Sequence, residues 1–276
     1  MSGRLFLVGT PIGNLEDISA RALRVLKDVN GILAEDTRHS AKLLRHYGIA
    51  TPLSAWHAHN EAQRLDAVLS RLAAGEDLAL ISDAGMPLIS DPGFPLVRAA
   101  RDAGYAVECV PGPTALIAAL VLSGFPAERF VFEGFLPARG PARREHLSRL
   151  AAETRTVILY ESPHRLADCL ADIAAVMGAE RPVCLARELT KRFESVYQDT
   201  AAALASWAQA PGEEGRGEFV VLIRGLDEAP IQHALDADRV LRELLAELPA
   251  RKAAKITARL CGGSANEYYA RSLQES

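Results

Sequence analysis

Residues 78–93 read LALISDAGMPLISDPG, an apolar run that passes directly into a loop rich in Asp, Pro, Gly and Ser. The run Leu78–Ile81 is continuously apolar, as in a strand that is covered on both faces of a parallel sheet. The twelve residues after it, Ser82–Gly93, contain two Asp, two Pro, two Gly and two Ser and are called the long loop below. Because open α/β sheets bind ligands at the carboxyl ends of their strands, this loop predicts a ligand site.

The same pattern of strand, loop and helix recurs through the first half of the chain. Short apolar runs at Arg4–Val8, Gly31–Ala34 and Ala106–Val110 are each followed by residues with helical periodicity. Such alternation is typical of an α/β domain with a parallel sheet. Further helices are predicted near residues 41–47, 61–74, 97–103 and 114–122.

The second half changes character. Strands are predicted at Phe130–Phe132, Thr156–Tyr160, Pro182–Arg187 and Glu218–Arg224, with helices near 142–152 and 165–177. Beyond Gly225 the pattern is helical only, over 237–248, 250–260 and 264–273, with a joint expected near Gly225–Ala229. We therefore expect an α/β protein with domains at residues 1–115 and 116–226, and a small helical bundle at 227–276.

Composition excludes several classes of protein. Hydrophobic residues make up 49% and charged residues 24% of 276 residues, which is incompatible with a disordered chain. The net charge of −4 disfavours a strongly basic nucleic-acid-binding domain. No stretch predicts a signal peptide or a membrane helix, and the cysteines lack CxxC spacing, so we expect a cytoplasmic protein with reduced thiols.

The loops after the strands indicate what kind of ligand to expect. The first, Gly9–Gly13, has GxxxG spacing instead of GxGxxG, and the chain contains no GxxxxGK[ST] motif, which disfavours dinucleotide and P-loop sites. Each loop alone could be a simple turn, because Gly and Pro are common at the ends of strands in many proteins. In the long loop, backbone groups beside Asp83 would suit a sulfonium ligand that carries an adenine and an amino acid.

Eight motifs resemble one known family in their order along the chain. They are LFLVGTPIGNLEDIS, AEDTRHS, ISDAGMPLISDPGFPLV, VPGPTALIAALVLSGFP, FEGFLP, LYESPHRL, LARELTKRFE and GEFVVLIRG. They resemble the ribosomal RNA small subunit methyltransferase I family, the 2′-O-ribose cytidine branch of the tetrapyrrole (class III) methylase superfamily. The resemblance runs from Arg4 to Gly225, and Val240–Leu273 resembles the family's C-terminal appendage.

The resemblance implies a two-domain class III homodimer that binds S-adenosylmethionine between its domains. It implies methyl transfer to the ribose 2′-oxygen of cytidine 1402 in 16S rRNA of the small ribosomal subunit, without a metal. The first loop departs from the GxGPG of the vitamin B12 and siroheme members. The family's cofactor contacts would fall on Thr10, Pro11, Asp83, Met86, Ile89, Thr114, Ala115, Tyr160, Leu185 and Glu218.

Polar residues at strand ends are candidates for the chemistry. A ribose hydroxyl is a weak nucleophile, so a base or a neighbouring cation would help it react. Glu161 or Asp36 could accept the proton, and Arg187 or Lys191 could hold the adjacent phosphate. The alternatives are structural: Glu161 could form an ion pair with Arg165, and Asp36 could cap a helix. His57 and His59 have HxH spacing, but no carboxylate or cysteine cluster lies beside them in the sequence.

Two basic segments have competing interpretations. The run 129–155 contains six Arg against three Glu, and is either a solvated helix face or a phosphate-contacting rim with Phe132 and Phe135 as stacking surfaces. In the tail, RNA could bind to the basic residues Arg251, Lys252, Lys255 and Arg259, or the bundle could serve only dimer packing.

Two other functions remain open at this stage. One is a tetrapyrrole C-methyltransferase on the same scaffold, which would need a large apolar trough. The other is a noncatalytic RNA-binding or ribosome-assembly factor that retains S-adenosylmethionine as a structural ligand.

Overall fold

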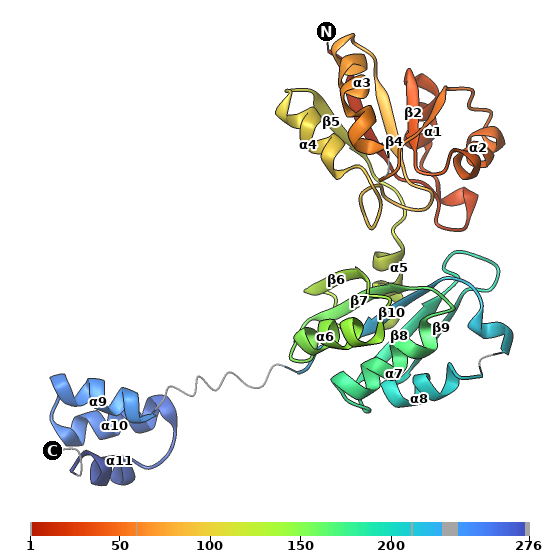
Figure 1. The fold of residues 1–276 in the computed structure, drawn as a ribbon. Coiled ribbons are helices and arrows are strands. Elements are labelled where there is room, and N and C mark those ends of the chain that lie inside the picture. The colour runs from red at the N-terminus through yellow and green to blue at the C-terminus, as the bar shows by residue number, and fades with distance from the viewer. Residues whose placement is uncertain (1, 59, 211, 228–236, 274–276) are drawn as a thin grey trace. The chain divides into compact units, whose positions relative to one another are not determined.

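The computed structural model describes residues 2–58, 60–210, 212–227 and 237–273. The chain forms two compact units, Met1–Gly225 and Leu226–Ser276, and each is described by itself. The larger unit contains two five-stranded sheets, each with its own helices (Figure 1). The α/β class with a helical tail, predicted from the sequence, is confirmed. None of the helices within the described ranges is both long and apolar enough to cross a membrane.

The first sheet is entirely parallel, with strand order β3-β2-β4-β1-β5. Its strands are β1 (Arg4–Val8), β2 (Gly31–Ala34), β3 (Leu53–Ala55), β4 (Leu78–Ile81) and β5 (Ala106–Val110). The helices between them are α1 (Ala20–Asp28), α2 (Thr37–His46), α3 (Glu61–Ala73) and α4 (Phe94–Asp102).

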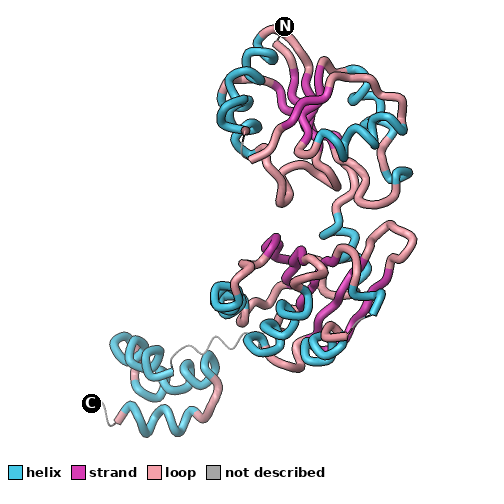
Figure 2. The backbone as a smooth tube through the Cα atoms, turned by 45° about the vertical axis from the view of Figure 1, so that its right-hand side comes forward, coloured by secondary structure: helices cyan, strands magenta, loops and turns pink. Residues whose placement is uncertain are grey.

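Both faces of this sheet are covered, as the continuous apolar strands predict (Figure 2). Phe6 and Val8 of β1 lie in the core with α1 and α2, whereas Leu5 lies in the core with α3 and α4. All four residues of Leu78–Ile81 are buried for the same reason. This packing fixes the carboxyl ends of β1, β2 and β4 along one edge, where Gly9–Gly13, Glu35 and the long loop begin.

The second sheet is mixed, with strand order β6-β7-β10-β8-β9, and only the β6–β7 pair is parallel. Its strands are β6 (Phe130–Phe135), β7 (Thr156–Glu161), β8 (Pro182–Arg187), β9 (Ser195–Thr200) and β10 (Phe219–Ile223). Strand β9 is absent from the sequence prediction because it is a polar edge strand, SVYQDT, with no fully buried residue.

Helix α5 (Ala115–Ser123) packs on one face of this sheet, against side chains such as Ile158 and Val220. Helices α6 (Gly140–Leu150), α7 (Leu166–Met177) and α8 (Ala201–Trp207) cover the other face. Because α5 follows the last strand of the first sheet directly, it begins where we expected the second domain to begin, and the division at residues 115–116 remains a proposal.

The smaller unit is a bundle of α9 (Ala237–Glu247), α10 (Ala250–Cys261) and α11 (Ala265–Ser272). Its core consists of Leu241, Ala253, Ala254 and Tyr268. The expected joint at Gly225–Ala229 lies partly outside the described residues, which resume at residue 237.

Candidate active site

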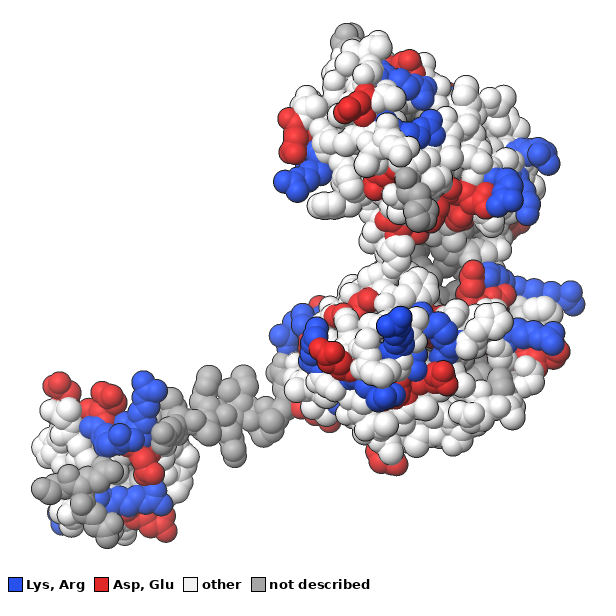
Figure 3. Space-filling model, viewed as in Figure 1, with Lys and Arg blue, Asp and Glu red and all other residues white. Residues whose placement is uncertain are grey.

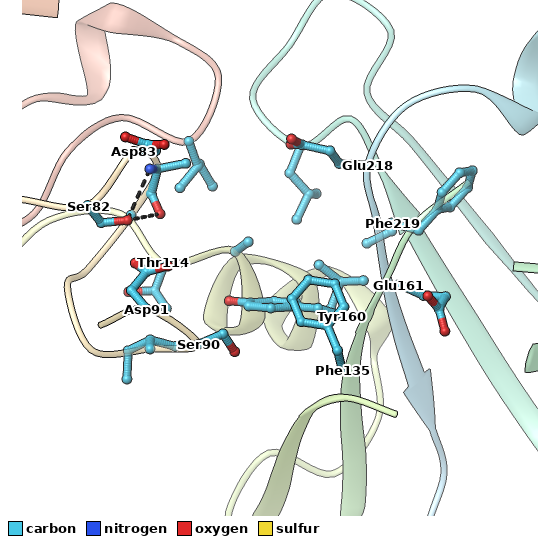
Figure 4. A pocket seen from close by; sticks show the side chains of 18 of the residues that line it. Ser82, Asp83, Ser90, Asp91, Thr114, Phe135, Tyr160, Glu161, Glu218 and Phe219 are labelled. Atoms are coloured by element: carbon cyan, nitrogen blue, oxygen red, sulfur yellow. Dashed lines mark hydrogen bonds between the residues drawn. The ribbon is translucent and has the colours of Figure 1, made fainter. Parts of the chain in front are cut away.

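A cavity of about 420 Å³ lies within the larger unit, between loops of the first sheet and the wall formed by the second. Its volume is in the range of small-molecule sites in proteins. Figure 4 shows the labelled side chains from both sheets around it. The lining residues are Ile12, Ser82–Met86, Ile89–Asp91, Thr114, Ala115, Phe135, Tyr160–Pro163, Ala186, Leu189 and Glu218–Val220.

The long loop forms one side of the cavity in a strained conformation. Leu88 and Ser90 have φ angles of 71° and 68°, in the left-handed region that disfavours residues other than Gly. Strain of this kind is found most often at ligand sites, where surrounding structure holds it. Here Ser82 helps to hold the loop, since its hydroxyl accepts from the Ala84 amide and donates to the Ala84 carbonyl, both at 3.1 Å.

Thr10 anchors the start of the long loop. Its backbone pairs with that of Gly85 in both directions, and its buried hydroxyl donates to the Ser82 carbonyl at 3.0 Å. Thr10 and Pro11 do not line the cavity, whereas Ile12 of the same loop does. Gly9, the first glycine of the GxxxG loop, is required sterically, because a Cβ at this position would lie 2.7 Å from the Cα of Gly112.

We expect Thr10→Val to lower the free energy of unfolding by about 1–2 kcal/mol, because the buried Ser82 carbonyl loses its donor. The Gly85 amide, which donates to the Thr10 carbonyl, should exchange its hydrogen faster. Chemical denaturation and hydrogen exchange measure the two effects. Thr154→Val on an exposed turn is the control, and equal stability of both variants would contradict the anchoring role.

Three carboxylates, those of Glu35, Asp83 and Asp91, lie near one another at this edge of the first sheet. Burial raises the pKa of Asp91, the Ser82 hydroxyl partly offsets this shift, and the charge of Asp83 adds to it. Burial likewise raises the pKa of Glu35, and Asp91, Asp83 and Asp36 add to the effect. Within the described ranges none of Glu35, Asp83 and Asp91 forms an ion pair, and the buried Oδ2 of Asp91 has no hydrogen-bond partner. The electrostatics of the cavity therefore favour a positively charged ligand.

Aromatic rings form the opposite wall. Tyr160 packs edge-to-face against Phe132, with ring centroids 4.9 Å apart, and against Phe135 at 5.7 Å. Burial raises the pKa of the Tyr160 phenol. The wall is apolar and rigid, which suits a planar ring or an aliphatic chain.

Glu161 lines the cavity, but its carboxylate points away from Tyr160 toward the other face of the sheet (Figure 4). It lies 3.3 Å from the guanidinium of Arg165, which also donates to the Leu136 carbonyl at 2.6 Å. The ion pair raised as the structural alternative is therefore present. Asp36 likewise has its capping geometry, accepting from the Arg38 amide at 2.8 Å at the start of α2, and it lies outside the cavity lining.

Arg187 and Lys191 hold the loop that follows β8. The buried guanidinium of Arg187 donates to the carbonyls of Arg216, Phe193 and Glu213. Lys191 donates to Glu188 at 2.8 Å and to Glu218 at 2.9 Å. Neither cation lines the cavity, but Lys191 positions Glu218, which does.

The structure brings together most of the predicted cofactor contacts. Leu185 is an exception, since its side chain lies in the core with α7 and the adjacent Ala186 lines the cavity in its place. Sequence reasoning missed Asp91 and Ser90, although both belong to the long loop that it singled out. The predicted cofactor contacts that line the cavity are Asp83, Met86, Ile89, Thr114, Ala115, Tyr160 and Glu218.

The arginine-rich run 129–155 is largely neutralised by its neighbours. Arg143 and Arg144 share Asp172, Arg149 pairs with Glu145, and Arg155 pairs with Glu153. Side chains of both signs alternate over this part of the chain on the face seen in Figure 3. Arg139 is exposed, and it has no ion pair or hydrogen bond from its side chain in the part of the chain that the structure describes.

The remaining sequence candidates are the HxH pair and the basic residues of the tail. The described residues contain no group of three or more His, Cys, Asp or Glu side chains that could hold a metal ion. His59 of the HxH pair lies outside the described residues. In the bundle, Lys252, Lys255 and Arg259 are exposed on α10, and Arg251 lies over the ring of Tyr269 at 5.6 Å.

Comparison with protein families gives two matches. The model of the tetrapyrrole (corrin/porphyrin) methylases matches residues 4–205, and that of the RsmI C-terminal HTH domain matches residues 232–276. The chain is 52% identical over 275 residues to ribosomal RNA small subunit methyltransferase I of Pseudomonas aeruginosa, covering 99% of this chain and 98% of the relative. The protein of the same name from Escherichia coli O157:H7 is 47% identical, with 99% and 96% covered.

Solved structures share the fold at low sequence identity. Cobalt precorrin-4 methyltransferase aligns with a TM-score of 0.62 at 18% identity, covering 80% of this chain and 94% of the other. Diphthine synthase gives a TM-score of 0.61 at 15% identity, with 81% and 90% covered. Uroporphyrin-III C-methyltransferase from Thermus thermophilus, complexed with S-adenyl homocysteine, gives 0.54 at 19%, with 82% and 98% covered.

Proposed function

Because the chain belongs to the tetrapyrrole methylase family and to its ribosomal RNA small subunit methyltransferase I branch, we propose that it methylates 16S rRNA with S-adenosylmethionine as the methyl donor. The proposed acceptor is the ribose 2′-oxygen of cytidine 1402 in the small ribosomal subunit. The proposal rests on the sequence identity of 47–52% between this chain and two relatives named ribosomal RNA small subunit methyltransferase I. That identity extends through the helical tail. We also propose that the enzyme acts as a cytoplasmic homodimer.

The cavity fits the proposed methyl donor. S-adenosylmethionine supplies a methyl group bonded to a positively charged sulfur, and it carries an ammonium group as well. The carboxylates of Asp83 and Asp91 form no ion pair with the described residues, so a positively charged ligand relieves their repulsion. We assign the donor contacts to Asp83, Met86, Ile89, Thr114, Ala115, Tyr160 and Glu218.

For the acceptor hydroxyl, we assign proton removal to Asp91. It lines the cavity, and its buried Oδ2 has neither a hydrogen-bond donor nor a cation beside it among the described residues. The buried Oε2 of Glu161 also lacks a hydrogen bond, but it lies 3.3 Å from the Arg165 guanidinium, and the Asp36 carboxylate caps α2. A raised pKa also makes Asp91 a better proton acceptor than an ordinary aspartate. Arg187 and Lys191 would then support the reaction indirectly, by holding the loop and Glu218 in place.

The test incubates the protein with S-adenosylmethionine labelled in the methyl group and either naked 16S rRNA or purified 30S subunits lacking the modification. Alkaline hydrolysis then distinguishes the product, because a 2′-O-methyl group blocks cleavage after its nucleotide whereas a base methyl group does not. We expect label at one cytidine, resistant to alkali.

Label that enters a porphyrinoid and neither RNA would instead identify a tetrapyrrole methyltransferase. A protein that binds 30S subunits and the donor without transferring label would be a noncatalytic assembly factor. Asp83→Ala tests the donor site in the same assay: we expect weaker S-adenosylhomocysteine binding and unchanged binding of 30S subunits.

A further inference from the structure

Phe135 owes its position to a bulge in strand β6. In a regular strand residues 132 and 135 would face opposite sides of the sheet, because side chains alternate. Here the register with β7 shifts between Phe132 and Gly134, and Gly134 has a φ of 61°. As a result Phe132 and Phe135 both contact Tyr160 on the same side. Bulges that redirect a side chain in this way are common next to active sites.

The redirected ring contributes little to the core. Phe135 lines the cavity and is 55% exposed, whereas Phe132 on the same strand is packed against the core beneath α5. An exposed Phe ring costs free energy in water unless a partner covers it. Its contact with Tyr160 is edge-to-face, with the ring planes 61° apart, so the two rings are not stacked on each other and much of the Phe135 ring stays accessible.

A cationic residue, Arg139, lies four residues after Phe135 in the sequence. Arg139 is the N-cap of α6 and is exposed, and its side chain has no partner among the described residues. Four other arginines of the run, Arg143, Arg144, Arg149 and Arg155, are each held by a carboxylate. An exposed aromatic ring followed by an unpaired arginine is the combination by which proteins bind unpaired nucleotides, with the base stacked and the phosphate neutralised.

We propose that Phe135 is the stacking platform for the base of the target nucleotide, which must be unpaired or rotated out of its helix to reach the cavity. This inference rests on the proposed function and adds to it the residue that receives the base. The donor contacts assigned above lie on the long loop, at Thr114 and Ala115, and at Tyr160 and Glu218, so the exposed Phe135 ring is left for the acceptor.

The test uses a single-stranded RNA oligonucleotide of the target sequence with the fluorescent base pyrrolocytosine at the target position. It is titrated with protein saturated with S-adenosylhomocysteine, and stacking on the ring should quench the fluorescence. We expect Phe135→Leu to abolish the quenching and weaken RNA binding about 5- to 150-fold, the range measured for loss of one stacked base. Phe135→Tyr should behave like the wild type.

Phe130→Leu is the matched control, since Phe130 lies on the same strand, is 36% exposed and does not line the cavity. Calorimetry with S-adenosylhomocysteine should give the same affinity for Phe135→Leu and the wild type. Undiminished quenching in Phe135→Leu, absence of quenching in the wild type, or a parallel loss of S-adenosylhomocysteine binding would overturn the proposal. The proposed function fails separately, if the wild type transfers no label to 30S subunits.

Discussion

Asp91→Asn is expected to lower the rate constant of methyl transfer by about 10²- to 10⁴-fold, the usual contribution of a general base. The amide has nearly the same shape as the carboxylate but does not accept a proton. Oδ2 of Asp91 is buried and has no hydrogen-bond donor among the described residues, and unlike the buried Oε2 of Glu161 it has no guanidinium beside it in that part of the chain. Single-turnover transfer to 30S subunits measures the effect, because it is independent of product release.

The pH dependence of this step follows from the pKa of Asp91. In the ligand-free protein burial raises that pKa, the Ser82 hydroxyl partly offsets the shift and the charge of Asp83 adds to it, whereas the positive charge of the bound donor lowers the pKa. A base works only when deprotonated, so the wild-type rate should rise with pH through the pKa that Asp91 has in the donor complex. The slope should be absent in Asp91→Asn. A carboxylate with a raised pKa stabilises the fold only below its pKa, so the variant should lose no stability at neutral pH.

Asp102→Asn is the matched control, an identical chemical change at a carboxylate on α4 that is 73% exposed and pairs loosely with Arg98 at 3.8 Å. It should transfer methyl groups at the wild-type rate. A rate for Asp91→Asn within a few-fold of the control would contradict the assignment of Asp91 as the base and leave Glu161 and Asp36 as candidates. Glu161→Gln and Asp36→Asn are therefore measured in the same series.

The sequence predicts β1, β2 and β4 well because each contains a short apolar run that the structure buries. It also directs attention to the long loop, since few other stretches concentrate Asp, Pro, Gly and Ser after a buried strand. The loop's effect on Asp91 is not readable from the sequence. That effect depends on left-handed conformations at Leu88 and Ser90, and on the start of the loop, which Thr10 holds through the carbonyls of Ser82 and Gly85.

Strand alternation explains the remaining differences between prediction and structure. Tyr160 and Glu161 are adjacent on β7, so their side chains face opposite sides of the sheet, and Tyr160 faces the cavity. Leu185 and Ala186 on β8 are related in the same way. The period of two is visible in the sequence, but which set of residues faces the cavity depends on where α5 packs. The bulge at Gly134 breaks the period altogether.

Asp172→Ala is expected to destabilise the larger unit by about 3–5 kcal/mol, the cost of leaving a buried charge without its partner. The side chains of Arg143 and Asp172 are 5% and 11% exposed, and Nε of Arg143 donates to Oδ2 of Asp172 at 2.7 Å. In the variant the Arg143 guanidinium keeps only a long bond of 3.4 Å to the Ala138 carbonyl. Thermal unfolding should show a fall of roughly 10 °C in the melting temperature.

Arg144→Met is the control within the same cluster, because Arg144 also contacts Asp172 but is 48% exposed. Its loss should cost less than about 1 kcal/mol, as for surface ion pairs. In the double variant Arg143→Met with Asp172→Leu no charge is left buried, so most of the lost stability should return. A double variant as unstable as Asp172→Ala would mean that the cost arises from packing between α6 and α7. The buried side chain of Arg143 would then stabilise the fold through packing alone, with no electrostatic contribution from Asp172.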